Sequence, residues 1–331
     1  MRVAACLAVM TLHVAAGNWY ATDVNSFSWQ ALNFWDALVR CGVPVFVMIS
    51  GALFLYPRKE IPVSKLYTKY IPRILIALIF WSFVYAMKDY VKTGDLLKAC
   101  AHFIRGHYHL WFLFMITGLY MIVPFLRKIA ESEKLTKYYL VLALIFTFTL
   151  PECANIISVF SEKYGTFAEK YVAGFHMEFV AGYTGYFLLG YVLDRMNISP
   201  KLERVIYLAG VLGVSFTVLM SSFASVYMNE ATEMFYKNQT VNVMCESVAV
   251  FVFFRMHFNR ESVIIRKLSQ YSFGAYLVHD AVIQLIRKLG LHSLTFCPVF
   301  SVPVAAAVVF MLSFTISGIL NHVPVLKKYI V

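Results

Sequence analysis

Two polar side chains stand out in the apolar opening of the chain. Arg2 and His13 are the only strongly polar residues between positions 1 and 16. On a helix they would lie about 16.5 Å apart along the axis and about 20° apart around it, and so share one face. A histidine inside a membrane segment is a candidate functional group by default, and imidazole exchanges protons near neutral pH. The alternative is a capping arginine and a hydrogen-bonded packing histidine.

A second polar group lies at the start of another apolar run. Asp36 and Arg40 are spaced i, i+4, which on a helix predicts a self-neutralising ion pair. A more specific hypothesis is that Arg40 binds a carbonyl or an anionic group of a ligand. One arginine can both pair with Asp36 and bind such a group. Pro44 follows and removes a backbone donor. It predicts a local break, which a membrane protein tolerates where the backbone is packed in protein or lines a cavity.

Histidines also open the apolar run at 109–126. His107 and His109 lie just before Trp111, at the end that we expect to face outward. Tyr and Trp at this depth are typical of an interfacial belt. His109 beside Trp111 also suits the edge of a polar pocket, so we expect these three residues near a substrate.

His279 is a further histidine that we expect deep in an apolar run. It lies eight residues after Tyr271, which is about 12 Å of helical rise. Two deeply placed histidines, His13 and His279, are harder to explain by packing than either alone. Together they favour a functional site inside the membrane.

The apolar run at 71–90 has a basic entry. Lys69 and Arg73 flank Pro72, and proline suits the first turn of a helix. These cations have two possible explanations, which the residues alone leave open. They could be a plain positive flank of a membrane segment, or they could cradle the phosphates of a cytoplasmic cofactor.

The elements that must position these residues are set by composition. Of 331 residues, 60% are hydrophobic and only 14% charged, and the mean hydropathy is +0.68. A soluble domain carries about 25% charged residues, so we expect an all-α, polytopic membrane protein. A membrane-spanning helix needs about 20 apolar residues. By this length we predict one domain, 1–331, with no internal repeat and ten membrane segments: 3–18, 37–56, 71–90, 109–126, 138–156, 178–194, 205–222, 240–257, 271–287 and 300–320.

Lysines and arginines orient these segments, because short cytoplasmic loops collect positive charge. With the amino terminus inside, 19 of the 29 fall on the cytoplasmic side and nine on the other, while Arg40 stays within a segment. We therefore expect both termini in the cytoplasm. We also expect the first segment to be retained rather than cleaved, with a few cytoplasmic residues before Met1.

The same distribution bears on partners and metals. The net charge of +11 comes from short loops between apolar spans, whereas a nucleic-acid binder gathers its basic residues in one soluble patch. We therefore expect the lipid bilayer, and no nucleic acid, as a partner. The six cysteines are scattered without a CxxC pair, and no metal-ligand spacing was found. We accordingly expect no metal.

Several runs together resemble the integral-membrane acyltransferase-3 family, in that family's order and over nearly the whole chain. They are Arg2-x10-His13, Arg40-x3-Pro44-x-Phe46-x3-Ser50-Gly51, His109-Leu-Trp111-Phe112-Leu, Gly185-Tyr-Phe-Leu-Leu-Gly190-Tyr and Ser272-Phe-Gly-x-Tyr276-Leu-x-His279. Within the family, the chain is most similar to the short bacterial branch that includes the O-acetyltransferase of enterobacterial common antigen.

The resemblance implies a ten-helix enzyme of the bacterial cytoplasmic membrane. It would move an acyl group, usually acetyl, from cytoplasmic acetyl-CoA or another acyl-CoA to a hydroxyl of a cell-surface or lipid-linked glycan. His13 would be the catalytic residue, and Arg2 would belong to the donor site with Lys69 and Arg73. The family tends to carry Arg-x-x-Arg at the third helix, where this chain has Tyr70 in the first place and Arg73 in the second.

The chemistry of acyl transfer agrees with this expectation. A sugar hydroxyl is a poor nucleophile until a base takes its proton, a role that suits His13, although an acyl-imidazole intermediate is also open. The thioester oxygen needs donors as it becomes an oxyanion, from Arg40 or from backbone near Pro44. A pantetheine arm could lie along the face shared by Arg2 and His13.

The first outer loop is the expected acceptor side. Trp29 and Tyr20 are predicted to lie within this loop, where aromatic faces and the carboxylate of Asp36 could hold a sugar. With His107 and His109, and with Trp111 and His279 deeper in, they would form the mouth through which a glycan reaches His13. An interfacial belt explains the neighbouring tryptophans equally well.

Two other classes compete with an acyltransferase. A transporter or flippase for a polysaccharide or lipid-linked glycan would also hold polar residues in its spans. Many such folds show an internal repeat with paired broken helices, which this sequence does not show. A non-catalytic assembly or sensing protein gives no reason for the placement of Arg2, His13 and His279.

The orientation can be tested with introduced cysteines. We expect residues 157–177 to face outward and residue 132 to face the cytoplasm. A cysteine at Ser161 should therefore react with an impermeant thiol reagent in intact cells, while one at Ser132 should react only after lysis. Labelling of Ser132→Cys with protection of Ser161→Cys would reverse the topology.

Overall fold

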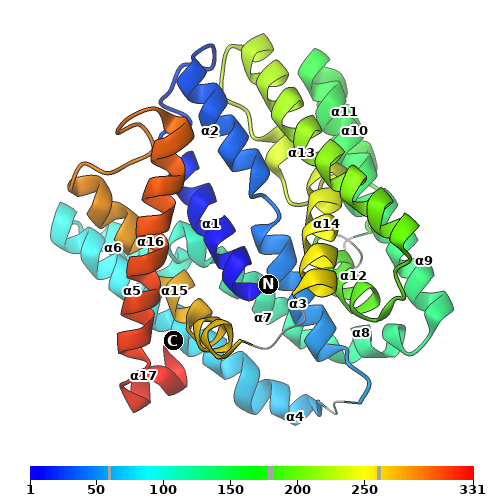
Figure 1. The fold of residues 1–331 in the computed structure, drawn as a ribbon, viewed down its shortest axis with the longest axis horizontal. Helices are drawn as coiled ribbons and strands as arrows, with labels where there is room; N and C mark the ends of the chain where they lie inside the picture. The colour runs from blue at the N-terminus through cyan, green and yellow to red at the C-terminus, as the bar shows by residue number, and fades with distance from the viewer. Residues whose placement is uncertain (59–60, 178–179, 181, 259–261) are drawn as a thin grey trace.

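The computed structural model describes residues 1–58, 61–177, 180, 182–258 and 262–331. Every regular element of these residues is a helix, which confirms the all-α class (Figure 1). In chain order the elements are α1 (Arg2–Ala16), α2 (Phe27–Leu38), α3 (Gly42–Phe54), α4 (Val63–Lys65), η1 (Leu66–Tyr70), α5 (Ile71–Thr93), α6 (Leu96–Arg105), η2 (Tyr108–Leu110), α7 (Trp111–Met121), α8 (Val123–Ala130), α9 (Glu133–Ala143), η3 (Leu144–Thr149), α10 (Leu150–Phe160), α11 (Glu162–Ala173), α12 (Thr184–Arg195), α13 (Pro200–Met228), η4 (Met234–Tyr236), α14 (Val241–His257), α15 (Val263–Lys288), α16 (Pro298–Leu320) and α17 (Pro324–Tyr329).

The described residues include five helical stretches that are long and apolar enough to cross a membrane. A sixth is possible if the pair Leu96–Met121 and Val123–Ala130, bent by 57°, is one span, and α1 is a shorter apolar helix. These stretches support a multi-pass membrane protein, while ten spans and cytoplasmic termini stay predictions. The five are Phe27–Phe54, Val63–Thr93, Glu133–Phe160, Pro200–Met228 and Pro298–Leu320.

The second span begins earlier than predicted. Its helix starts at Phe27 rather than near residue 37, because the hydroxyl of Ser26 accepts a hydrogen bond from the backbone N–H of Trp29 and caps α2. The span then breaks at residues 39–41, and Pro44 lies in the first turn of α3. The break expected near Pro44 is therefore confirmed, directly before the proline.

Two further segments differ from the expected pattern. The region 157–177, expected as a loop, forms the end of α10 and the helix α11, which pack together. The predicted segment 178–194 begins on residues 178, 179 and 181, which lie outside the described residues, and its remainder is α12.

Helix α1 lies in the middle of the molecule and contacts α2, α3, α15 and α16 (Figure 1). Cys6, Met10 and Ala15 of this uniformly apolar helix are fully buried. A helix that packs against neighbours on several sides must be apolar on all of them, and α1 is. Near its two ends, Arg2 is exposed and lines a cavity, whereas His13 is half-buried among the neighbouring helices.

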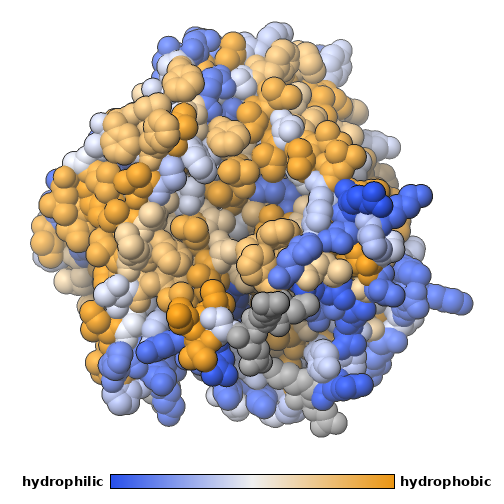
Figure 2. All heavy atoms as spheres, viewed as in Figure 1, coloured by the Kyte–Doolittle hydropathy of each residue, from blue (hydrophilic) through white to orange (hydrophobic). Residues whose placement is uncertain are grey.

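The outer surface is apolar over much of its area. Figure 2 shows hydrophobic side chains over the middle of one face, while hydrophilic ones gather toward its lower and right edges. Exposed large side chains on α13 and α16 include Leu208, Leu212, Leu219, Met311 and Ile319. Large exposed apolar surface on a chain of this composition fits contact with lipid.

Glycines bring α3 and α12 into direct backbone contact. A Cβ placed on Gly51 would collide with the carbonyl of Phe187, and one on Gly190 would collide with the carbonyl of Met48. Small residues of this kind let helices in membranes approach closely. The glycines of two of the quoted motifs therefore have a packing role at one helix pair.

Candidate functional site

His13 and His279 meet at the contact between α1 and α15. The Nδ1 atom of His13 lies 2.8 Å from Nε2 of His279, and the two rings stack with centroids 4.9 Å apart. His279 is fully buried. The two histidines predicted to lie deep in apolar runs are thus hydrogen-bonded to one another across 266 positions of sequence.

The hydrogen-bond network assigns the tautomers of this pair. Nδ1 of His279 contacts the carbonyl oxygen of Tyr276, which can only accept, so this nitrogen carries the proton. In the neutral pair Nε2 of His279 is then the acceptor, and His13 donates to it from Nδ1. The Nε2 atom of His13 is left with its lone pair free, which is the form a general base needs.

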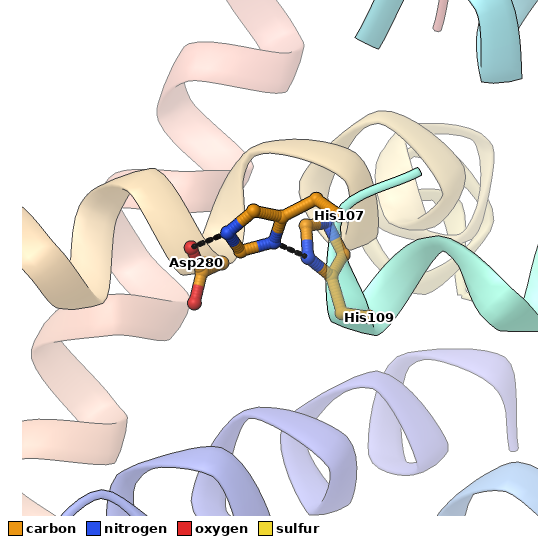
Figure 3. Close-up of side chains that lie close together, drawn as sticks. All are labelled: His107, His109 and Asp280. Carbon is orange, nitrogen blue, oxygen red and sulfur yellow. Dashed lines mark hydrogen bonds and ion pairs between the residues drawn. The ribbon is translucent and has the colours of Figure 1, made fainter. Parts of the chain in front are cut away.

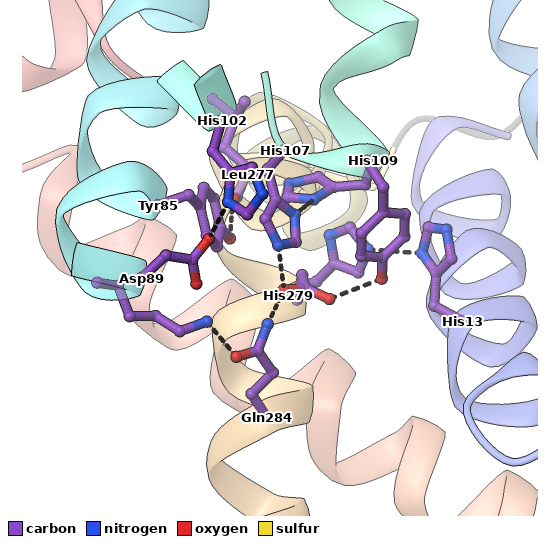
Figure 4. Close-up of polar contacts among 12 residues, drawn as sticks. His13, Tyr85, Asp89, His102, His107, His109, Leu277, His279 and Gln284 are labelled. Atoms are coloured by element: carbon purple, nitrogen blue, oxygen red, sulfur yellow. Dashed lines mark hydrogen bonds and ion pairs between the residues drawn. The ribbon is translucent and has the colours of Figure 1, made fainter. Parts of the chain in front are cut away.

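Further polar side chains, among them His107 and His109, lie beside this pair (Figure 4). The hydroxyl of Tyr108 donates to Asp280 at 2.6 Å, and Nε2 of His107 lies 3.7 Å from the same carboxylate. His107 and His109 meet Nδ1 to Nδ1 at 2.9 Å, and the ring of His109 lies against that of His279 with centroids 5.0 Å apart. The predicted neighbourhood of His107, His109 and His279 is present.

A cavity of about 800 Å³ lies beside α1 and is lined by the residues predicted to bind the acyl donor. Arg2, Lys69 and Arg73 all line it, although they come from three separate elements. Lys267 of α15 and Lys327 of α17 add two further cations that the sequence reasoning had counted only as cytoplasmic loop charge. Lysine and arginine gathered in one cavity suit an anionic ligand, phosphate above all.

The same cavity also has an apolar wall that reaches toward the histidines. Val9 lines it one helical turn before His13, and Tyr276 lines it one turn before His279. Phe46 and Phe112 contribute aromatic rings that lie 6.1 Å apart by their centroids. A volume of this size, charged in one part and apolar in another, suits a long ligand with a polar head.

A much smaller pocket, of about 20 Å³, touches His13 itself. Its walls include Asn18, Arg287 and His292, and Arg287 donates to the side-chain oxygen of Asn18 at 2.8 Å. Sequence reasoning missed these three residues, and Arg287 was counted only as outer loop charge. His13 itself lines this small pocket, and Val9, one helical turn before it on α1, lines the large cavity.

The ion pair predicted between Asp36 and Arg40 is confirmed at 2.8 Å. The guanidinium of Arg40 also stacks on the ring of Tyr236, 4.2 Å from its centroid, and its Nε has no hydrogen-bond partner among the described residues. Asp36 is 1% exposed, so its carboxylate serves Arg40 rather than an open sugar site. Arg40 retains one buried N–H for a further acceptor.

Comparison with known proteins decides the class of the protein. A family model described as an acyltransferase domain, that of acyltransferase 3, matches residues 1–322. The chain belongs to the acyltransferase-3 family. Neither the comparison with curated proteins nor that with solved structures gave a match. The protein is therefore a membrane acyltransferase, and the transporter alternative is not favoured.

Tyr70 occupies the position where the resemblance led us to expect an arginine. The ring of Tyr70 packs edge-on against Phe54, with centroids 5.1 Å apart, and lines the same large cavity as Lys69 and Arg73. Lys69, directly before Tyr70, therefore supplies a positive charge at this part of the cavity. Arg73 donates to the carbonyl oxygen of Val331 at 2.8 Å, so the end of the described chain lies against this residue.

The expected position of Trp29 in the acyltransferase is wrong. Trp29 lies within α2 rather than in a loop, its side chain is fully buried, and its ring packs against that of Trp19 with centroids 5.3 Å apart. The cap at Ser26 starts the helix early and turns Trp29 into the core. A sugar would find its ring already covered.

Two other residues expected near the acceptor side are on the surface. Tyr20 does lie in the loop between α1 and α2, where its hydroxyl donates to Glu233 at 2.5 Å. Partial burial and this carboxylate raise the pKa of Tyr20 to about 12, which keeps the phenol neutral at physiological pH. Trp111 is 40% exposed and contacts Tyr183, with centroids 5.8 Å apart.

Trp29 can be tested as a core residue. Trp29→Ala should destabilise the acyltransferase by roughly 3–5 kcal/mol, because the substitution opens a cavity in the core. Phe27→Ala, on the same helix at a position 68% exposed, should leave the melting temperature in detergent nearly unchanged. Acyl transfer and acyl-CoA hydrolysis should then fall together in Trp29→Ala. Loss of acceptor use alone, at an unchanged melting temperature, would restore the sugar-binding hypothesis.

Proposed function

We propose that this acyltransferase moves an acyl group, usually acetyl, from cytoplasmic acyl-CoA to a hydroxyl of a cell-surface or lipid-linked glycan, in the bacterial cytoplasmic membrane. The observation that supports the proposal is that His13 lines a pocket of about 20 Å³, while Arg2 and Val9 of the same helix line a cation-rich cavity of about 800 Å³. A two-substrate reaction across a membrane needs a reactive group that both sides can reach.

The large cavity is the proposed donor site. Arg2, Lys69 and Arg73 would hold the phosphates of CoA, with Lys267 and Lys327 beside them. The pantetheine arm would follow α1 from Arg2 past Val9. Eleven residues of helix span about 16.5 Å, so an extended arm is what the separation of Arg2 and His13 requires.

The small pocket is the proposed place of the acceptor hydroxyl. A space of about 20 Å³ holds about one water molecule, and therefore one hydroxyl. Asn18, Arg287 and His292 place hydrogen-bonding groups on its wall. Glycan hydroxyls suit such a wall, and the exclusion of bulk water would protect the thioester from hydrolysis.

His13 is the proposed base. Its free Nε2 would take the proton of the acceptor hydroxyl as the oxygen bonds to the thioester carbon, while the N–H at Nδ1 stays hydrogen-bonded to His279. The carbon–sulfur bond would then break, and His13 would return the proton to the departing CoA thiolate. The unpaired N–H of Arg40 is the proposed donor to the oxyanion.

The role of His13 is tested by substitution with a matched histidine control. His13→Ala should lower transfer of a radiolabelled acetyl group from acetyl-CoA into membrane glycan by at least about 10²-fold, because general base catalysis is lost. His257→Ala, on α14, should retain transfer, since His257 pairs with Glu203 at 3.0 Å in an exposed contact. Both variants should elute as folded protein in detergent. Near-normal transfer by folded His13→Ala would remove the central claim.

The donor site is tested by the kinetics of Arg73. Arg73→Gln should raise the KM for acetyl-CoA by about tenfold, which is about 1.4 kcal/mol, with little change in kcat, because a phosphate contact is present in ground and transition states alike. Arg204→Gln is the control, because Arg204 donates to the carbonyl oxygen of Pro200 on the same helix, α13, and is not among the residues that line the large cavity. An unchanged KM in Arg73→Gln would place CoA elsewhere while leaving the role of His13 intact.

A further inference from the structure

Three side chains with metal-ligating atoms converge beside the histidine pair (Figure 3). His107 and His109 bracket the start of η2, and Asp280 comes from α15. One nitrogen of each histidine and one carboxylate oxygen lie within 4.8 Å of one another. The residues are remote in sequence, which explains why no metal spacing was visible before folding.

The three ligand atoms, which lie within 4.8 Å of one another, would have to move closer together to hold a metal ion. Two imidazole nitrogens on a tetrahedral zinc ion lie about 3.3 Å apart, given Zn–N distances of about 2.0–2.1 Å. His107 offers either Nδ1, 2.9 Å from Nδ1 of His109, or Nε2, 3.7 Å from Oδ2 of Asp280. Small movements of these side chains would bring one nitrogen of each ring and the carboxylate onto a common centre.

Two buried groups point to a ligand, because among the described residues one lacks a hydrogen-bond partner and the other lacks a lysine or arginine to balance its charge. The side chain of His109 is fully buried, and its Nε2 has no hydrogen-bond partner among the described residues. Asp280 is 3% exposed, yet in the described part of the chain no lysine or arginine forms an ion pair with it. A buried carboxylate is costly unless a cation or a metal compensates its charge.

Neighbouring groups already orient the carboxylate. Tyr108 donates to one oxygen of Asp280 at 2.6 Å, and the amide of Gln284 donates to the other at 2.5 Å. Lys88 donates to Gln284 rather than to Asp280, so it sits one step outside the cluster. Such outer contacts fix metal ligands in position and are a usual part of metal sites.

We propose that His107, His109 and Asp280 bind a divalent transition-metal ion, with zinc as the first choice. Two imidazoles and one carboxylate suit zinc, whereas magnesium and calcium prefer oxygen ligands. Three protein ligands leave a fourth position open to water. The ion would link the turn between α6 and α7 to α15, next to His279. This proposal departs from our expectation, from the sequence alone, that the protein binds no metal. This proposal does not depend on the proposed acyl transfer.

The test measures metal bound to the full chain in detergent. After chelator treatment and dialysis against zinc chloride, elemental analysis should find about one zinc ion per wild-type chain. His109→Ala and Asp280→Asn should lose binding by more than the roughly 10–100-fold that outer-shell changes cost. His102→Ala is the control, because His102 pairs with Asp89 at 2.8 Å outside the cluster and should keep the full zinc content.

Two further measurements keep the result decisive if a variant fails to fold. Cobalt added to the apoprotein should give visible absorption bands that zinc displaces, and zinc should raise the melting temperature of the wild type. Tyr108→Phe, which removes only the hydrogen bond to Asp280, should weaken zinc binding by about 10–100-fold. Less than about a tenth of an ion per wild-type chain, or equal zinc in His102→Ala and Asp280→Asn, would overturn the proposal.

Discussion

The hydrogen bond between His13 and His279 is the contact on which the centre of the molecule depends. Each imidazole is costly inside an apolar interior, and each satisfies a nitrogen of the other at 2.8 Å. Since His279 in turn donates to the carbonyl of Tyr276, the network runs from the side chain of α1 into the backbone of α15. This polar contact adds a specific link between α1 and α15 to the close packing of α1 against its neighbours.

Much of this centre was predictable from residue type and spacing. Arg2 and His13 could be placed on one face because both lie within one helix, and Lys69 and Arg73 were marked by charge at the entry of an apolar run. The structure brings Arg2, Lys69 and Arg73 to one cavity, as expected for a shared ligand. The pairing of His13 with His279 was not predictable, because it depends on how α1 and α15 turn toward one another.

Other features depend on single side chains and on tertiary contacts, which the hydropathy of a segment does not predict. A single hydroxyl, that of Ser26, begins α2 ten residues before the expected segment and so buries Trp29. Arg287 looked like ordinary loop charge, yet the fold places it on the wall of the pocket that touches His13. The cluster of His107, His109 and Asp280 likewise exists only once η2 and α15 are in contact.

The position of His13 at the small pocket, one helical turn from the large cavity, has a consequence for the proposed reaction. Transfer from a thioester to an alcohol needs no net proton, because the proton lost by the hydroxyl is the one gained by the thiolate. A single imidazole can therefore serve both substrates if each reaches the same nitrogen. The tautomer set by His279 leaves Nε2 of His13 as that nitrogen, since Nδ1 is occupied. If His13 is the base, as proposed, both ligands would have to come to it, and the lining of the large cavity by Arg2 and Val9 and of the small pocket by His13 agrees with that requirement.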